Sequence, residues 1–430
     1  MIEPGTSTAS TGITKTEPKP DPKAEPKTEP KAEPKSETKS GTEEEAARTR
    51  PQAVPSAGAP SANVPVLPLT LGVEEEFLLV DAHTLRVVPA APLVLSTAAG
   101  LPHELHAEGT RYQVEISTPV ADSAATLRSE LAGLRRTLAR AARAHGCRLL
   151  AAPSPVLAVE GPLHLTDDEP RQREQARRFG ALTDTLVSCG RHVHVGTLDV
   201  DTAVAVSNRV RPWLPTLIAL AANSPFWGGR DTGHASWRAM AWAGWPSAGL
   251  PPHFTSTAHF RRSVQTLLGS GAALDTKMVY WDLRPSGNWP TLELRAPDMS
   301  PDIDSAILQA ELARALVATA LRDIAEQRPD PPVRDDVLRL ARWRAAHDGL
   351  EGFGLDPYTG VELPAADLAE ALLDLVAPEL SASGDLDHAA RTMAGLLRDG
   401  SGAHRQRTAF ARRGDLKDVL RHLADETEAS

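Results

Sequence analysis

Apolar and polar residues alternate in several short stretches of the first two thirds of the chain, whereas the last third places apolar residues at helical spacing. Alternation is typical of a strand with one buried face, and a spacing of three or four residues is typical of an amphipathic helix. We predict strands at residues 71–80, 85–89, 112–118, 147–152, 189–197, 277–286 and 290–298. We predict helices at residues 123–145, 169–187 and 202–222 and, with breaks, from 302 to 423. Strands that come in hairpins and helices that cluster late predict an α+β fold built on an antiparallel sheet.

The strand predicted at residues 71–80 carries three consecutive carboxylates, Glu74, Glu75 and Glu76. Alternation places Glu74 and Glu76 on one face of the strand and Glu75 on the other. Two carboxylates on one face repel each other, so the pair favours a cation between them. Magnesium, a hard ion that prefers oxygen ligands, is the leading candidate. The alternative is an edge strand whose charges face water and discourage pairing with another chain.

Three further predicted strands carry polar residues of the same kind. Glu115 lies on the polar face of its strand, and His192 and His194 share a face of theirs. Glu293 and Arg295 are two residues apart, so they also share a face. If these strands lie in one sheet with their polar faces aligned, they form an acidic floor that holds two or more divalent cations.

Such a floor is suited to phosphate chemistry. Divalent cations neutralise a nucleotide triphosphate and leave arginines to meet the transferring phosphoryl group. A zinc hydrolase would also use His192 and His194, but a zinc site normally needs only about three protein ligands and has no use for so many carboxylates. The chain has no GxxxxGK[ST] loop and no GxGxxG after a strand, so a nucleotide would have to bind on the sheet itself.

Residues 223–246 hold four of the eight tryptophans of the chain among glycines, together with Arg230 and Arg238. A glycine-rich loop with aromatic and positively charged residues can wrap an anionic small molecule. The alternative is a lobe that packs its own tryptophans.

The composition narrows the class of protein. A net charge of -10 argues against a general nucleic-acid binder, because recognition of a phosphate backbone needs a concentrated positive field. Two cysteines, Cys147 and Cys189, give no disulfide framework and fit a reducing compartment. No stretch approaches the roughly 20 apolar residues of a membrane-spanning helix. We therefore predict a soluble cytoplasmic protein without a nucleic-acid or membrane partner, and the small-molecule substrates follow from the motifs below.

The N-terminal part differs from the rest of the chain. Residues 1–63 have almost no large apolar side chains and include a repeated Glu-Pro-Lys-like unit. Prolines at this spacing remove backbone donors, and the mixed Lys and Glu side chains keep the segment solvated. We predict a disordered tail at residues 1–63, followed by a single catalytic domain at residues 64–430.

Several separated motifs resemble one family in the right order. They are GVEEEFLLVD, QVEIST, CGRHVHVG and YWDLRPSGNWPTLELRAPD, and they resemble the carboxylate-amine ligases of the glutamate-cysteine ligase type 2 family. The similarity covers about residues 66–407. It implies a glutamine-synthetase-like fold, a curved antiparallel sheet with helices packed against it. It also implies a reaction driven by ATP and Mg²⁺, in which the γ-carboxylate of L-glutamate becomes an acyl phosphate and the amine of L-cysteine displaces phosphate to give γ-glutamylcysteine.

The resemblance also implies roles for individual residues. By motif match, the predicted metal ligands are Glu74, Glu76, Glu115, His192 and Glu293. Arg295 is similar to a phosphate contact of the family, and we expect it to bind ATP and act in catalysis. Independently of the resemblance, we expect Arg284 to act in catalysis and Arg230 to bind ATP, and one of these two arginines to hold a substrate carboxylate by a bidentate contact.

Two other functions stay open at this point. One is a metal-dependent hydrolase centred on His192 and His194, and the other is a non-catalytic nucleotide-binding protein. A homodimer is the default expectation for the assembly.

Overall fold

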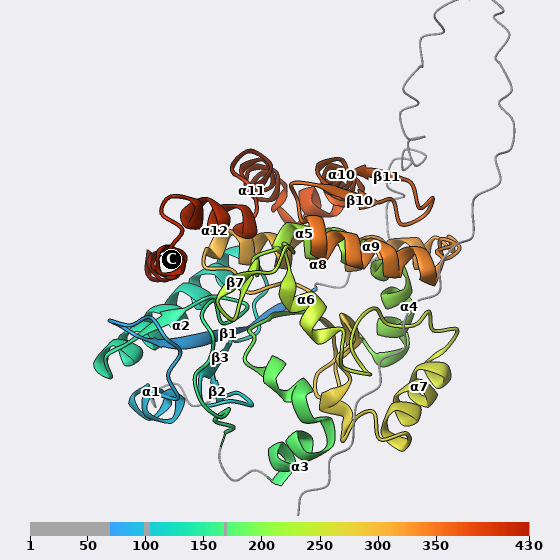
Figure 1. Ribbon diagram of the computed structural model, residues 1–430. Coiled ribbons are helices and arrows are strands. Elements are labelled where there is room, and N and C mark those ends of the chain that lie inside the picture. The colour runs from blue at the N-terminus through green and yellow to red at the C-terminus, as the bar shows by residue number, and fades with distance from the viewer. Residues whose placement is uncertain (1–68, 99–103, 167–169, 430) are drawn as a thin grey trace, which may run out of the picture. The chain divides into compact units, whose positions relative to one another are not determined.

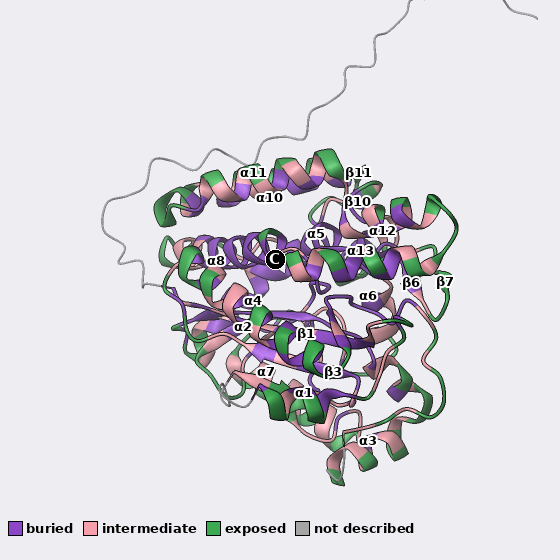
Figure 2. Cartoon of the chain, turned by 90° about the vertical axis from the view of Figure 1, so that its left-hand side faces the viewer, coloured by how far each residue is buried: buried purple, intermediate pink, exposed green. Residues whose placement is uncertain are grey.

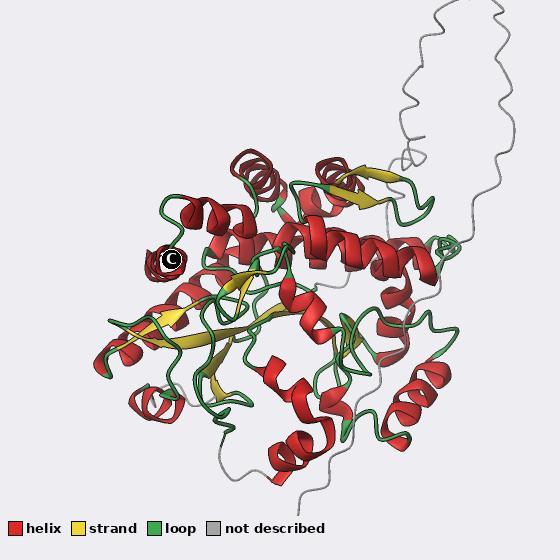
Figure 3. Ribbon diagram, viewed as in Figure 1, coloured by secondary structure: helices red, strands yellow, loops and turns green. Residues whose placement is uncertain are grey.

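The long strand β1 (Leu71–Asp81) is paired on both sides within a seven-stranded sheet. The structure is a computed structural model that describes residues 69–98, 104–166 and 170–429. The other strands of this sheet are β2 (Leu105–Ala107), β3 (Gln113–Ser117), β4 (Cys147–Leu150), β5 (Arg191–Gly196), β8 (Leu283–Pro285) and β9 (Thr291–Leu294). Within the described ranges their order is β2-β3-β1-β5-β9-β8, with β4 also paired to β1, and every pair is antiparallel. The predicted α+β fold on an antiparallel sheet is thus confirmed (Figures 1 and 3).

Two long helices, α2 (Ala124–Ala144) and α8 (Ile303–Ala325), pack against β1. The hydroxyl of Ser123 accepts a hydrogen bond from the Thr126 amide and so caps α2 at the predicted start. Leucines at helical spacing, among them Leu127 and Leu131, are fully buried on α2. Each such leucine contributes about 2 to 5 kcal/mol of stability relative to alanine. Helix α8 is buried along most of its length, as its purple colour in Figure 2 shows.

The remaining elements surround this layer. The other helices are α1 (Ala91–Thr97), α3 (Pro170–Phe179), α4 (Val200–Val210), α5 (Leu214–Ala221), α6 (Trp237–Trp242), α7 (Thr257–Gly269), α9 (Asp335–Asp348), α10 (Ala365–Ser383), α11 (Leu386–Asp399), α12 (Gly402–Ala411) and α13 (Leu416–Ala429). Two short hairpins are formed by β6 (Phe226–Trp227) with β7 (Arg230–Asp231), and by β10 (Phe353–Leu355) with β11 (Glu362–Pro364). In the described part of the chain, no helix is both long enough and apolar enough to cross a lipid bilayer.

The prediction of a strand at residues 85–89 is wrong, because the structure has no strand there. This stretch holds one isolated bridge, at Val87. Asp81 accepts a hydrogen bond from the Thr84 amide at 2.7 Å, and Leu85 has a φ of 60°. The turn chemistry of an aspartate side chain and a left-handed residue therefore outweighs the apolar pattern.

The strand predicted at residues 277–286 is shorter than expected. Its first residues belong to a 3₁₀ turn, Thr276–Met278, and only its end forms β8. Asp275 caps that turn by accepting a hydrogen bond from the Lys277 amide at 2.9 Å, which competes with strand pairing. The predicted tail of residues 1–63 lies outside the described residues.

Candidate active site

The polar residues singled out in the sequence lie on one face of the sheet. Glu76 is directly opposite Glu115 across β1 and β3, and Glu74 is directly opposite His192 across β1 and β5. Across β5 and β9, His194 is opposite Glu293. Directly opposed residues of an antiparallel pair point to the same face. The structure therefore brings the predicted residues together on one surface, which we call the acidic floor.

The first group of the floor consists of Glu74, His192 and Glu293. Each offers one ligand atom, and these atoms all lie within 4.8 Å of one another. His192 Nδ1 lies 2.8 Å from Glu74 Oε2. His192 and Glu293 are buried, so the group is shielded from water on the sheet side. Two carboxylates and one imidazole form a donor set that suits a divalent cation.

The second group consists of Glu76, Glu108 and Glu115, with ligand oxygens again within 4.8 Å of one another. Glu108 is absent from the residues predicted from the sequence. It follows β2, a three-residue strand that pairs with β3. A prediction of that short edge strand would have placed Glu108 beside Glu115, but three residues carry too little alternation to be recognised.

The carboxylates of the second group repel one another. Burial, followed by the hydrogen bond and the negative charge of Glu108, raises the pKa of Glu115 well above its usual range. Burial and the charge of Glu108 raise the pKa of Glu76 to about 8, although the Gly190 amide donates a hydrogen bond to it at 2.7 Å. A divalent cation among these oxygens would favour their ionised forms.

The carboxylates of the first group are held in the ionised state. Burial alone would raise the pKa of Glu74, but hydrogen bonds from His192 and His194 outweigh burial and lower it. Burial is likewise outweighed for Glu293, whose pKa is lowered by the charges of Arg295 and Arg284. Burial and the nearby charge of Arg295 lower the pKa of His192 to about 4, so its imidazole is neutral and has a lone pair for a metal at neutral pH.

Two arginines stand at the Glu293 side of the floor. Arg284 of β8 donates from Nε to Glu293 Oε2 at 2.8 Å and from Nη1 to the carbonyl of Val279 at 2.7 Å. Arg295 follows β9, donates to the other oxygen of Glu293 and has Nη1 at 3.5 Å from His192 Nδ1. Both cations are thus beside the first group, in position to meet an anion that binds there.

The arginines of the tryptophan-rich segment behave differently from each other. Arg230 is exposed on β7 and makes no side-chain contact with the acidic floor in the described part of the chain. Arg238 is buried, and its guanidinium donates to the carbonyls of Arg295 and Pro297 at 3.5 and 3.3 Å. A Cβ atom at Gly190 would lie 2.1 Å from Arg238 Nη2, so only glycine allows this approach. The prediction from the sequence assigned ATP binding to Arg230 and no role to Arg238, although Arg238 is the one whose guanidinium contacts the backbone of Arg295.

Two tryptophans of this segment, Trp242 and Trp245, pack on each other near the start of β5. Trp242 stacks on Trp245 with ring centroids 5.8 Å apart, and both contact Tyr280 edge to face. The indole nitrogen of Trp242 donates to the hydroxyl of Ser188 at 2.8 Å, just before β5. The segment therefore forms an aromatic cluster next to the strand that carries His192.

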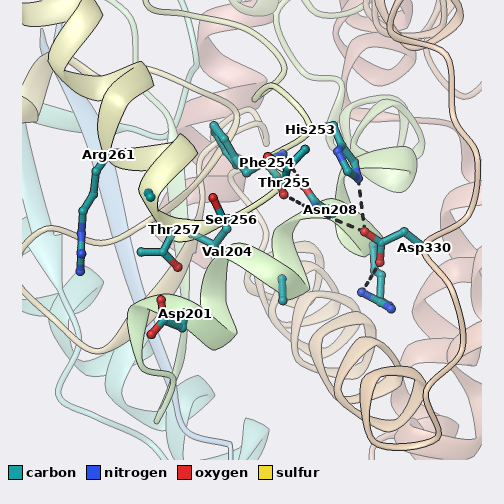
Figure 4. A pocket seen from close by; sticks show the side chains of 13 residues that line it. Asp201, Val204, Asn208, His253, Phe254, Thr255, Ser256, Thr257, Arg261 and Asp330 are labelled. Carbon is teal, nitrogen blue, oxygen red and sulfur yellow. Dashed lines mark hydrogen bonds and ion pairs between the residues drawn. The ribbon is translucent and has the colours of Figure 1, made fainter.

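A cavity of about 650 Å³ lies apart from these residues, between α4 and the start of α7 (Figure 4). Asn208 anchors one wall by hydrogen bonds to both backbone groups of Phe254, and His253 contacts Asp330 at 3.2 Å. None of the residues of the acidic floor lines it.

Two solved structures share the fold. A glutamate-cysteine ligase from Francisella tularensis, in complex with AMP, superposes with a TM-score of 0.63 at 14% identity, and the match covers 85% of this chain and 90% of that one. A bifunctional glutathione synthetase from Pasteurella multocida gives a TM-score of 0.64 at 15% identity over 84% of this chain and 52% of that one. At these identities the likeness concerns the fold, and it places this chain in the glutamate-cysteine ligase class of antiparallel-sheet folds.

Sequence comparisons narrow the class to a family. The model of glutamate-cysteine ligase family 2 matches residues 70–422. A protein of Saccharopolyspora erythraea, named provisionally as glutamate-cysteine ligase 2-1, is 46% identical over 364 residues, which is 84% of this chain and 96% of that protein. One of Salinispora arenicola, named provisionally as glutamate-cysteine ligase 2, is 45% identical over 361 residues, 84% of this chain and 95% of that protein. This chain belongs to glutamate-cysteine ligase family 2 and is a carboxylate-amine ligase, which confirms the family and class implied by its motifs.

Proposed function

We propose that this chain uses ATP to activate the γ-carboxylate of an amino acid as an acyl phosphate and then couples it to an amine. L-Glutamate and L-cysteine are the proposed substrates, and γ-glutamylcysteine, ADP and phosphate are the products. The observation that carries the proposal is the pair of acidic groups on one sheet face with Arg284 and Arg295 beside them. Family membership supports the reaction class, and the names of the relatives support the substrates.

The donor sets fit divalent cations. Glu74, His192 and Glu293 would hold one Mg²⁺, and the three carboxylates of the second group would hold another. Bound Mg²⁺ supplies positive charge that lowers the repulsion between a carboxylate and a triphosphate. The raised pKa values of Glu76 and Glu115 are compatible with this assignment, because burial and the neighbouring carboxylates raise both, and a bound cation would favour the ionised forms.

The protein side chains have distinct roles in the proposed reaction. A substrate carboxylate oxygen attacks the γ-phosphorus of ATP, the bond to the β-phosphate oxygen breaks, and ADP leaves. Arg295 and Arg284 stabilise the charge on the phosphoryl oxygens, since both guanidinium groups lie next to the first group. The amine then attacks the carbonyl carbon of the acyl phosphate, and phosphate leaves with the bonding electrons while the amine loses a proton.

Water has to be kept from the acyl phosphate until the amine arrives. The aromatic cluster around Trp242 and Tyr280 is the proposed barrier, because it lies next to β5 and carries few polar groups. Arg230 is retained as a proposed contact of ATP. Its side chain is exposed on β7, whereas that of Arg238 contacts the backbone of Arg295 beside the floor.

The hydrolase centred on His192 and His194 is the weaker proposal. The imidazole of His192 lies against Glu74, and that of His194 has Nδ1 at 2.9 Å from the Thr291 hydroxyl. Carboxylates outnumber imidazoles on this floor, which favours magnesium and phosphates over a zinc-bound water.

Production of ADP tests the proposal. Purified protein with Mg²⁺, ATP, L-glutamate and L-cysteine should release ADP and γ-glutamylcysteine in equal amounts, and omission of either amino acid should lower the amide yield to background. A panel of other amino acids and amines tests the choice of substrates. If no pair of substrates yields ADP or an amide, the ligase proposal is refuted. Hydrolysis of a substrate in the absence of ATP would instead support the hydrolase.

A further inference from the structure

Glu75, the central residue of the three consecutive glutamates, lies behind the acidic floor. Its side chain is 0% exposed and points away from the face that carries Glu74 and Glu76. A fully buried carboxylate is costly unless it is paired and hydrogen-bonded. The groups that pair with the Glu75 carboxylate therefore show what role this residue has.

Two buried arginines surround Glu75. Arg135 of α2 donates from Nε to Oε2 at 2.8 Å and from Nη2 to Oε1 at 2.7 Å, which is a bidentate contact. Arg191 of β5 donates from Nε to Oε1 at 3.1 Å. The side chains of both arginines are at most 1% exposed. We call these three residues the ion triad.

The two arginines of the ion triad also hydrogen-bond to the backbone of the segment that leads from β9 into α8. Arg135 donates to the carbonyls of Ser300 and Pro301 at 3.1 and 2.5 Å, and Arg191 donates to that of Ser300 at 3.4 Å. One carboxylate thus ties together β1, β5, α2 and the start of α8. These elements are far apart in the sequence, so the triad is a long-range link between them.

The position of the triad in the sheet relates it to the floor. Glu75 is directly opposite Arg191 across β1 and β5, and the next pair along, Glu74 with His192, faces the floor. A slip of one residue between these strands would turn every side chain to the other face. The buried contact between Glu75 and Arg191 therefore opposes any slip that would separate Glu74 from His192.

We propose that Glu75 is a positioning residue for the acidic floor, and that the ion triad sets the affinity of the floor for divalent cations by holding β1 and β5 in register from behind. The inference rests on the proposed function, since it assumes that the floor binds metal. Partners that orient metal ligands commonly change metal affinity by roughly 10- to 100-fold when they are lost.

Two variants separate geometry from charge. Glu75→Gln keeps the size of the side chain but removes its charge, so the two arginines lose their anion and the register contact weakens. Glu75→Asp keeps the charge but shortens the side chain by one methylene, so the carboxylate cannot reach both arginines in the same geometry. It also provides a test if the glutamine variant fails to fold.

Binding of Mn²⁺ alone, measured by calorimetry and by electron paramagnetic resonance, tests the proposal without requiring turnover. We expect the dissociation constant to rise about 10- to 100-fold in Glu75→Gln and by a smaller factor in Glu75→Asp. Both measurements are made at a temperature at which circular dichroism shows the variant to be folded.

Asp385→Asn is the matched control. Asp385 forms another buried ion pair, with Arg314 of α8, and contacts no residue of the floor. This variant should lose stability but bind Mn²⁺ as the unaltered chain does. Unaltered Mn²⁺ affinity in a folded Glu75 variant would overturn the positioning role while leaving the proposed function intact. Absence of Mn²⁺ binding to the unaltered chain would overturn the metal-binding floor, and the inference with it.

Discussion

Glu76 on β1 and Glu115 on β3 are directly opposed across the sheet, and with Glu108 they form a group whose ligand oxygens lie within 4.8 Å of one another. Opposed like charges destabilise a sheet in isolation. Here they lie on the same face as Glu74, which pairs with a histidine instead. The floor therefore has two parts. The group of Glu74, His192 and Glu293 lies near Arg284 and Arg295, and the group of Glu76, Glu108 and Glu115 consists of carboxylates that repel one another.

Glu293→Gln should abolish turnover. The change removes one charged ligand without a change in volume, and we expect the rate to fall at least about 100-fold. The fold should persist, because Arg284 retains its bond to the Val279 carbonyl. Steady-state rates and thermal unfolding measure the two effects. Glu379→Gln, which alters the ion pair between α10 and Arg322 of α8, is the control. Retained activity in Glu293→Gln would remove this residue from the site.

Glu108→Gln should raise the Mg²⁺ concentration needed for half-maximal rate by about 10-fold or more, since one oxygen ligand of the second group loses its charge. The change should also lower the pKa of Glu76 and Glu115, because the charge of Glu108 helps to raise both. Magnesium titrations of the rate test the first effect. Glu104→Gln, four residues earlier, should leave the titration unaltered, and an equal effect of both changes would contradict a specific role for Glu108.

Arg284→Lys should lower kcat by about 10-fold or more. Lysine keeps the charge but cannot make two parallel contacts with Glu293 and also reach the Val279 carbonyl. The matched change is Arg413→Lys, in a bidentate pair with Asp418 near the C-terminal helix. Kinetics at saturating ATP compare the two. Equal small effects would show that the geometry of Arg284 does not matter to the reaction.

Stability should depend on pH through Glu311 of α8. Its carboxylate is 1% exposed and lies 2.8 Å from His388 Nδ1, and burial raises its pKa from 4.5 to about 7. The folded chain then binds this proton more tightly than the unfolded chain, so the contribution is complete below pH 4.5 and is lost as the pH rises towards 7. The loss amounts to at most about 3 kcal/mol.

Denaturant unfolding between about pH 5 and 8 measures this dependence. Glu311→Gln should flatten the decrease in the free energy of unfolding, whereas Asp323→Asn, which alters an ion pair with Arg328 near the other end of the same helix, should not. An unaltered slope in Glu311→Gln would show that another group causes it.

Deletion of residues 1–60 should leave the rate unaltered. The family match begins only at residue 70, and the composition of the deleted part cannot form a core. Activity of the shortened chain under the same conditions provides the measurement, and a large loss would reveal a function for the tail.

The alternation of polar and apolar residues in the sequence was sufficient to predict which side chains share a face of a strand. Alternation along β1 separates Glu74 and Glu76 from Glu75, because the strand period of two is a property of the backbone itself. The same reasoning placed His192 with His194 and Glu293 with Arg295. The motifs identified the family, because several of them occur in the right order.

The tertiary structure alone decided which residues meet. Glu108 joins the floor through an edge strand too short to show a pattern, and Arg238 reaches it only because Gly190 leaves room. Glu75 acquires its partners from α2 and β5, 60 and 116 residues away in the chain. Sequence spacing determines the face on which a side chain lies. Its neighbours across the sheet depend on strand order and register, which arise from packing between distant segments.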